Sequence, residues 1–354
     1  MDSRIHRKSC FSALVLVMCA AATFTMASRH AVALQPPSIN QLVTIATEFS
    51  DQQRQQVEDY AQYWVPELLS DNLERVRLAK RRLLEPFGVL GIRRVFRDEY
   101  ARAAVPELEK VIGSANTFAA VNAVQITAEF QNDVALSALQ ARSGAQESRW
   151  QIRLWAARGI ERIVRSAEDI PPRSIDLAVR ELSRAGENES HWLVLQRQFE
   201  AIAAAKTERS QEAQVSLLER TLQRIAEDAS EPSELMMPVH RSLLLLRNQL
   251  LDPTLPSSQL RSLGTETAPL LGQVLEIGIL HWDAADADEN VRLSYHGAMS
   301  VAKALLELVD SQVRGPQAQR PTITTAWGNG NKSTFEADVA RWQSVLNAPP
   351  YAGR

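Results

Sequence analysis

From about residue 39 to residue 312, amphipathic helical segments follow one another with only short interruptions. The interruptions carry residues that usually end helices or form turns, such as Gly113-Ser114 and Pro171-Pro172. Leu, Ala, Arg, Glu and Gln dominate the composition and favour helices, and only 14 residues are glycine. Beyond residue 33, no alternating run of β-branched or aromatic residues predicts a strand. We therefore expect an all-α protein.

An apolar-Arg-Leu pattern recurs at 76–78, 152–154 and 291–293. Counted from each arginine on a helix of 3.6 residues per turn, apolar or small residues at −1, +3, +6, +7 and +10 form one stripe, with the arginine at its border. In the second and third copies the stripe consists of Ile152, Ala156, Gly159, Ile160 and Ile163, and of Val291, Tyr295, Ala298, Met299 and Ala302. The first copy has Val76, Leu83, Leu84 and Phe87, but Lys80 interrupts it.

The flanks of these copies add further shared residues. The first copy is preceded by a proline and an acidic turn, and Val105-Pro106 echoes Val65-Pro66. The pattern resembles the HEAT repeat, a helical hairpin of about 40 residues. The matching positions are Pro66, Asp71, Val76 and Arg77, and later Asp288, Val291 and Arg292. The copy at Arg153 departs from it, with Glu147 in the turn and no helix proline, and the second helices at about 118, 193 and 239 lack the arginine.

The resemblance implies about six hairpins between residues 40 and 310, spaced by roughly 34–52 residues and stacked into an irregular right-handed α-α superhelix. It also implies protein binding along an extended concave surface. The arginine at the border of each stripe is then expected to bond a turn carboxylate or the carbonyl groups of an adjacent unit.

The N-terminus has the features of a secretory signal peptide. Basic residues within the first eight positions precede an apolar run from Phe11 to about Ala22, which is shorter than the ~20 residues of a membrane span. Small-residue patterns place cleavage after Ala27 or Ala33. Both cysteines of the chain, Cys10 and Cys19, fall inside this segment, and a lipidated Cys19 is the alternative reading. We expect export to the periplasm or the outside of the cell, and no stable membrane span after removal of the signal.

The predicted domain organisation is a signal peptide at 1–33, a repeat domain at 34–313, a linker at 314–332 and a C-terminal helix with its tail at 333–354. The linker segment holds two prolines and three glycines and shows no helical period. Ser333 to Glu336 has the form of a capping box. The apolar stripe of the last helix predicts a face that docks on the repeat domain, and it consists of Phe335, Val339, Trp342 and Leu346.

The stretch 281–297, HWDAADADENVRLSYHG, is the first candidate for a metal or catalytic site. It does not fit an EF-hand loop, because counting from Asp283 puts Asp288 where glycine is needed and Ser294 where glutamate is needed. The repeat explains it better: Asp286 or Asp288 caps the following helix, Glu289 lies in its first turn, and His296 points to solvent. His281 and His296 then belong to different helices. We predict a structural turn, with no catalytic, metal or cofactor-binding residue.

Other candidates have ordinary explanations too. Arg158, Arg162 and Arg165 share one side of a helix, either as an anion-binding patch or as a solvated face paired with Glu161 and Glu168. His191 is expected at a helix start and His281 at a helix end, so their shared His-Trp sequence indicates no common ligand role. Satisfied packing or surface exposure is the expectation for His240. Core packing is the expectation for the helical tryptophans, with a cluster of exposed rings that binds peptide or glycan as the alternative, and these tryptophans are Trp64, Trp150, Trp155 and Trp192.

The chain has no glycine-rich phosphate loop, HExxH motif, Gly-x-Ser-x-Gly motif or paired-cysteine site. Its net charge of −3 argues against nucleic-acid binding. We expect an exported, non-catalytic scaffold or protein-binding module of the cell envelope, with no cofactor. An all-α polysaccharide hydrolase or lyase with two carboxylates ~5–10 Å apart is the alternative, and a calcium-stabilised structural protein using 283–289 is a third hypothesis.

Overall fold

The computed structural model describes residues 36–354 except 167–169, 228–231, 286–287, 325–326, 328–330 and 353–354. The contacts divide the chain into two units, 1–36 and 37–354. The predicted signal peptide, both predicted cleavage positions, Cys10 and Cys19 lie outside the described residues.

The second unit is helical, and its described residues contain no strand, so the all-α prediction is confirmed. Two 3-10 helices, η1 (Pro66–Leu69) and η2 (Glu85–Gly88), flank the third α-helix. The α-helices are α1 (Gln41–Thr44), α2 (Asp51–Trp64), α3 (Leu73–Leu84), α4 (Arg94–Ile112), α5 (Thr117–Thr127), α6 (Asp133–Gln140), α7 (Trp150–Arg165), α8 (Pro172–Gly186), α9 (Trp192–Ala204), α10 (Glu208–Glu227), α11 (Met236–Leu250), α12 (Ser257–Leu280), α13 (Trp282–Ala285), α14 (Glu289–Val313) and α15 (Lys332–Leu346).

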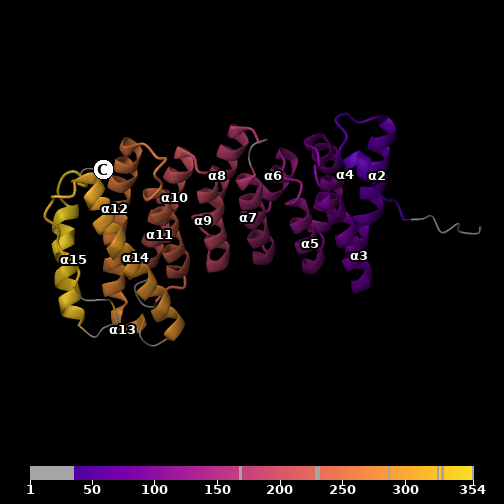
Figure 1. Ribbon diagram of the computed structural model, residues 1–354. Coiled ribbons are helices and arrows are strands. Elements are labelled where there is room, and N and C mark those ends of the chain that lie inside the picture. Colours follow the sequence, from indigo (N-terminus) through magenta and orange to yellow (C-terminus); the bar gives the residue numbers. More distant parts are fainter. Residues whose placement is uncertain are drawn as a thin grey trace, which may run out of the picture. The chain divides into compact units, whose positions relative to one another are not determined.

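The helices of this unit stack in two layers (Figure 1). In one layer, here the α2 layer, each helix packs on the next in the order α2, α4, α6, α8, α10, α12, α15. The other, here the α3 layer, runs α3, α5, α7, α9, α11, α14. Helices of the two layers also pack as hairpins: α2 with α3, α4 with α5, α6 with α7, α8 with α9, α10 with α11, and α12 with α14. The core lies between the layers, because a lone hairpin cannot bury its apolar stripe.

The stripes predicted from the repeat are buried in the stack. In α7 all of the predicted stripe, from Ile152 to Ile163, is inaccessible or nearly so. In α14 Tyr295, Ala298, Met299 and Ala302 are buried, and Val291 is partly so. The 3.6-residue period was therefore a sound guide to the faces that pack.

Asparagine and aspartate side chains start many of these helices. Asn72, Asn116, Asn132 and Asp288 each accept backbone N–H groups in the first turn of α3, α5, α6 and α14, which satisfies donors that the helix itself leaves unpaired. The predicted capping box at Ser333 is wrong, because the side chain of Asn331 caps α15.

Pro66, the proline that precedes the first copy of the pattern, lies between the two α-helices α2 and α3. α2 ends at Trp64, and Pro66 opens the separate 3-10 helix η1. Proline has no backbone N–H to continue the α-helical ladder, yet it fits the first turn of a new helix, where that donor is not needed.

The C-terminal helix docks through its predicted apolar face on the other helices of the stack. α15 packs against α12, and Phe335, Val339, Trp342 and Leu346 are all buried. The described residues of 314–332 also contact the body, since Ile323 and Trp327 are buried and the Trp327 indole donates to the Gly278 carbonyl at 3.0 Å. The described helices include none that is both long enough and apolar enough to cross a membrane.

Candidate functional site

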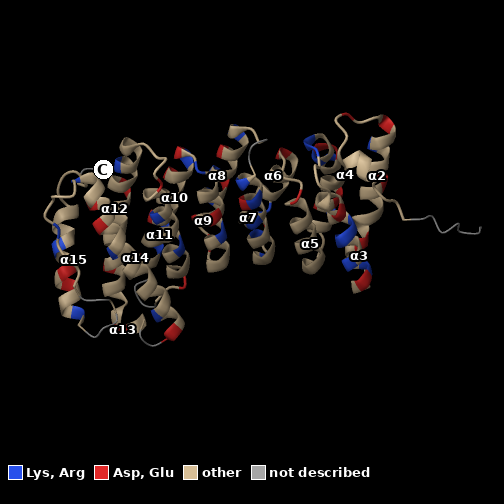
Figure 2. Ribbon diagram, in the orientation of Figure 1, with Lys and Arg blue, Asp and Glu red and all other residues tan. Residues whose placement is uncertain are grey.

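A groove with a volume of about 760 Å³ crosses the α3 layer, and we call it the α3-layer groove. It is lined from α3, α5, α7 and α9 and from the turn that follows α5, so it extends over four consecutive helices of one layer. Figure 2 shows Lys and Arg residues on α3 and α7. The charged side chains of the lining are Lys80, Arg158, Arg162, Arg165, Arg197, Glu129 and Glu161.

Lys80 is the half-buried cation of this groove. Its Nζ donates to Asn122 Oδ1 at 2.9 Å and to Gln125 Oε1, both on α5. Neither acceptor carries a charge, and Lys80 forms no ion pair with a described carboxylate. Burial lowers the pKa of Lys80, because the charged ammonium loses hydration without a balancing anion.

Arg158 extends from α7 over an aromatic ring. Its guanidinium carbon lies 4.8 Å from the centre of the Trp155 ring, within the range of a cation–π contact. Arg158 is exposed, Trp155 is partly exposed, and both line the groove. Stacking of a guanidinium on a ring leaves the N–H groups in its plane available to an acceptor.

The other arginines of the lining have carboxylate partners. Arg162 pairs with Glu129 at 2.5 Å, and Arg165 pairs with Glu161 at 2.6 Å. The predicted pairing with Glu161 is therefore confirmed for Arg165. Arg162 pairs with Glu129, which was not predicted, and Arg158 is exposed without an ion pair to a described carboxylate. Glu168, the other predicted partner, lies outside the described residues.

Next to the groove, one carboxylate forms ion pairs with two arginines. Glu200 on α9 is buried and pairs with Arg197 of the same helix and with Arg241 of α11, the latter at 2.7 Å. The groove is therefore lined by five cationic side chains and only two carboxylates. A third carboxylate, that of Glu200, lies beside the groove and is divided between Arg197 and Arg241. The surface has a marked positive excess.

The repeat arginine of α7 has the structural role that the resemblance implies. Arg153 makes a two-pronged ion pair with Glu189, at 2.7 and 2.8 Å, in the turn before α9, and also donates to the Glu147 carbonyl. Arg149 pairs with Glu147 and donates to carbonyls at the end of α4. The side-chain hydrogen bond from Arg149 lowers the pKa of Glu147.

The equivalent arginines at 77 and 292 do not repeat this arrangement. Arg77 is exposed and pairs within its own helix with Glu74. Arg292 is also exposed. The expectation that every repeat arginine bonds a neighbouring unit is therefore wrong for Arg77, whose side chain reaches only one turn along its own helix.

The stretch 281–297 contains α13 and the first turns of α14, and its described histidine and acidic side chains do not gather at one site. His281 ends α12 and is buried, whereas His296 on α14 is exposed to solvent as predicted. Asp288 caps α14, and Asp283 forms an exposed ion pair with Lys332. Asp286 is outside the described residues, and within them no three His, Cys, Asp or Glu side chains are grouped to hold a metal ion.

The remaining candidates are distributed along the stack. His191 starts α9 and stacks on the Trp150 ring at 4.2 Å, so its position differs from that of His281, as predicted. Trp64 is buried, but Trp150, Trp155 and Trp192 are only partly so. The prediction of core packing is confirmed for Trp64 alone. The helical periodicity of the sequence did not predict that Trp155 lines a groove.

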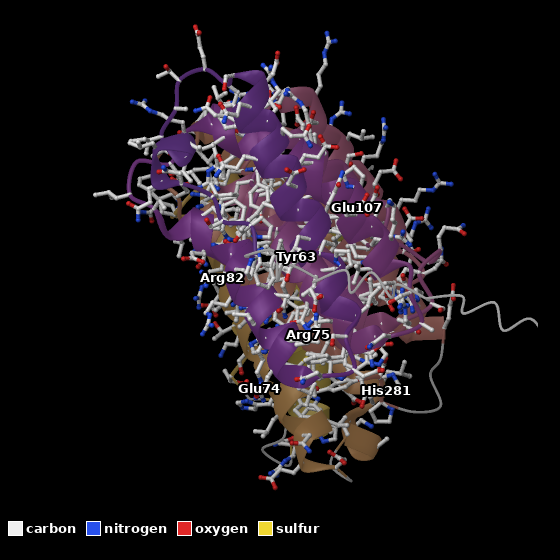
Figure 3. The ribbon with its side chains drawn as sticks, turned by 90° about the vertical axis from the view of Figure 1, so that its right-hand side faces the viewer. Tyr63, Glu74, Arg75, Arg82, Glu107 and His281 are labelled. Atoms are coloured by element: carbon white, nitrogen blue, oxygen red, sulfur yellow. The ribbon has the colours of Figure 1, made fainter. Side chains whose placement is uncertain are left out.

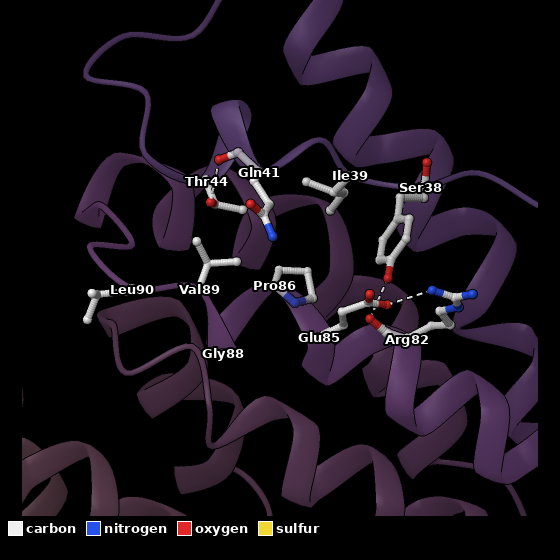
Figure 4. A pocket seen from close by; sticks show the side chains of 11 residues that line it. Ser38, Ile39, Gln41, Thr44, Arg82, Glu85, Pro86, Gly88, Val89 and Leu90 are labelled. Atoms are coloured by element: carbon white, nitrogen blue, oxygen red, sulfur yellow. Dashed lines mark hydrogen bonds and ion pairs between the residues drawn. The ribbon is translucent and has the colours of Figure 1, made fainter.

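A second pocket, of about 440 Å³, lies beside α1 and the end of α3 (Figure 4). The Tyr60 hydroxyl donates to the Arg82 carbonyl, and the Arg82 side chain pairs with Glu85 at 2.8 Å. Burial raises the pKa of Tyr60, so this phenol stays protonated as a donor. Figure 3 views the α2–α3 end of the stack, where Arg82 and the ion-paired Arg75 are labelled. Tyr60, Arg82 and Glu85 of this pocket are bonded within this set, and we regard the α3-layer groove as the better candidate.

Comparisons with known proteins add no family. No protein-family model matches the chain, and no curated protein matches it. The crystal structure of an engineered protein matches with a TM-score of 0.38 and 17% sequence identity, covering 69% of this chain and 97% of that chain. A likeness of that size carries no argument about this protein.

Proposed function

We propose that the chain is an exported, non-catalytic scaffold that binds other proteins of the cell envelope, built as an irregular right-handed superhelix of HEAT-like hairpins. The observation that carries this proposal is the α3-layer groove, which four consecutive helices line together. A stack of hairpins presents such a surface because each hairpin contributes one helix to it.

The chemistry of the groove supports binding more than bond cleavage. Its two carboxylates, Glu129 and Glu161, are each held by an arginine. A glycosidase instead presents two carboxyl groups to opposite sides of a sugar, one of them as a proton donor. Trp155 and Arg158 are groups that commonly anchor protein partners.

The proposal can be tested by photo-crosslinking in cells that produce the protein. A benzoylphenylalanine residue replaces Trp155 in the groove, and a matched control replaces Leu177, which is 41% exposed on α8 of the other layer. We expect a discrete protein adduct in the envelope fraction from position 155 and none from position 177. No adduct at 155, or the same adducts from both positions, would contradict partner binding in the groove.

A direct activity assay distinguishes the hydrolase or lyase alternative from the scaffold proposal. Purified protein is incubated with envelope polysaccharide from the producing cell, and new reducing ends or unsaturated sugar products are measured. We expect neither. Product formation that is lost in Glu129→Gln or Glu161→Gln would replace the scaffold proposal with the enzyme.

A further inference from the structure

We infer that the α3-layer groove binds an extended acidic segment of the partner protein, and that Lys80 and Arg158 each receive one of its carboxylates. This inference rests on the proposed function and specifies the chemistry of the partner.

The first argument is the contrast in charge between the groove and the chain. The whole sequence has a net charge of −3, yet the groove has five cationic side chains and two carboxylates. A positive patch on an acidic protein attracts an anionic ligand locally, while the rest of the surface repels it. The ligand is therefore oriented toward the patch as well as attracted to it.

The second argument is that two of these cations have unused binding capacity. An ammonium group has three donors, and Lys80 directs two of them to the neutral oxygens of Asn122 and Gln125. Arg158 rests on Trp155 and forms no ion pair with a described carboxylate. A carboxylate from a ligand would supply the missing counter-charge for both, and charge-assisted hydrogen bonds are the strong ones.

The third argument is spacing. Arg158 and Arg162 are one turn apart on α7, a rise of about 6 Å. Side chains on the same face of an extended peptide recur every ~6.8 Å, so alternate acidic residues match successive turns of the helix. A ligand carboxylate opposite Arg162 would meet a guanidinium that is already paired with Glu129. We therefore expect the ligand carboxylate to bind more strongly at Arg158 than at Arg162.

The fourth argument separates a peptide from other polyanions. Gln125 and Gln131 line the same groove, and side-chain amides can bond both the N–H and the C=O groups of a peptide main chain. Grooves for single-stranded nucleic acid depend on several aromatic rings that stack with successive bases. Trp155 is the single aromatic residue among the described residues that line this groove.

The test is fluorescence anisotropy with a labelled peptide of alternating Glu and Ser residues, alongside the same peptide with Gln in place of Glu. We expect saturable binding of the Glu peptide that weakens as salt is raised, and no saturable binding of the Gln peptide. Arg158→Gln and Lys80→Gln should each weaken binding about tenfold, the loss typical of one hydrogen bond to a charged group.

The matched control is Arg220→Gln, which removes the same charge from the exposed surface of α10 in the other layer. It should leave the affinity for the Glu peptide unchanged. Circular dichroism and thermal unfolding establish that each variant is folded. Equal losses in all three variants, or equal binding of the Glu and Gln peptides, would overturn the inference.

Two further probes, a single-stranded oligonucleotide and an oligouronate, test the other polyanions. If either binds the groove more tightly than the Glu peptide, with the same dependence on Arg158, the acidic-peptide inference is wrong. If no acidic probe binds but the crosslink at position 155 still captures a protein, the scaffold proposal stands and only the acidic character of the partner fails.

Discussion

Two buried aspartates connect the C-terminal part of the chain to the stack. Asp310, 1% exposed in α14, accepts from Arg314, Arg320 and the Tyr351 hydroxyl. Asp338 in α15 accepts the backbone N–H and the hydroxyl of Thr324. Burial of a carboxylate is costly unless its oxygens are fully bonded, and here each binds more than one donor.

Asp310→Asn should therefore be strongly destabilising. The amide cannot balance two neighbouring guanidinium groups, and breaking a buried ion pair by removing one partner typically costs about 3–5 kcal/mol. Urea unfolding followed by circular dichroism measures the change. Asp283→Asn is the control, because Asp283 is 82% exposed in its ion pair with Lys332 and such pairs contribute about 0–1 kcal/mol. Similar losses in the two variants would contradict the assigned role of Asp310.

His240 predicts a pH dependence of stability. Burial, followed by the charge of Arg241, lowers the pKa of His240. The unfolded chain then binds the proton more readily than the folded protein, so stability present above the unfolded pKa of about 6.5 is lost as the pH falls through it.

The corresponding experiment compares thermal unfolding at pH 7.5 and pH 5.5. We expect the wild-type midpoint to fall at the lower pH, and His240→Gln to show a smaller fall because the variant has no imidazole to protonate. His296→Gln, which changes an exposed histidine on α14, should keep the wild-type dependence. A wild-type response in the His240 variant would show that other groups cause it.

At the scale of elements, α15 packs on one face of α12 and approaches it closely at Gly272. A side chain at Gly272 would place its Cβ only 2.6 Å from Leu346 of α15, so glycine permits the two helices to approach there. The described residues 314–324 and Trp327 return along the body and add to the same packing. The last helix is therefore part of the core of this unit.

Trp342→Ala tests that conclusion. Trp342 is 1% exposed in α15, and truncation of a buried tryptophan removes apolar contact and leaves a cavity, at a typical cost of about 3–5 kcal/mol. Urea unfolding measures the loss. Ser344→Ala, at an exposed position of the same helix, should change stability by no more than about 0.5 kcal/mol. If Trp342→Ala also had so small an effect, α15 would not be docked as described.

At the scale of the whole helical unit 37–354, extensive contacts join helices that are neighbours in the stack. Stability in such an array is approximately a sum of local terms and interfaces between adjacent hairpins. The rings of Tyr100 and Phe130 have centres 5.0 Å apart, in α4 and in the turn after α5, whereas Trp342 belongs to α15, with many helices between.

Double-mutant cycles should reflect this arrangement. Tyr100→Leu combined with Phe130→Leu should show a coupling energy of about 0.5–3 kcal/mol, because the two rings touch. Tyr100→Leu combined with Trp342→Leu should be additive to within about 0.5 kcal/mol, because the substituted residues share no partner. Free energies from urea unfolding provide the measurement, and strong coupling of the distant pair would indicate a single cooperative core in place of a nearest-neighbour array.

Periodicity determined much of this protein without any structure. The spacing of apolar residues was enough to predict an all-α chain, the buried stripes of α7 and α14, and the docking face of α15. The capping preference of aspartate likewise placed Asp286 or Asp288 at the start of α14, and Asp288 is the N-cap. These features depend on residues within one or two turns of each other, and local chemistry therefore determines them.

Tertiary structure alone decided where the side chains of different helices meet. Lys80 looked like a break in an apolar stripe, and only the packing of α3 on α5 turns it into a half-buried cation facing a groove. The stacking order likewise brings Arg158, Trp155 and Arg197 to the same groove and leaves Arg77 on the surface. Sequence spacing fixes which face of a helix is buried, but a binding surface forms between helices, and its composition depends on which faces the stack places side by side.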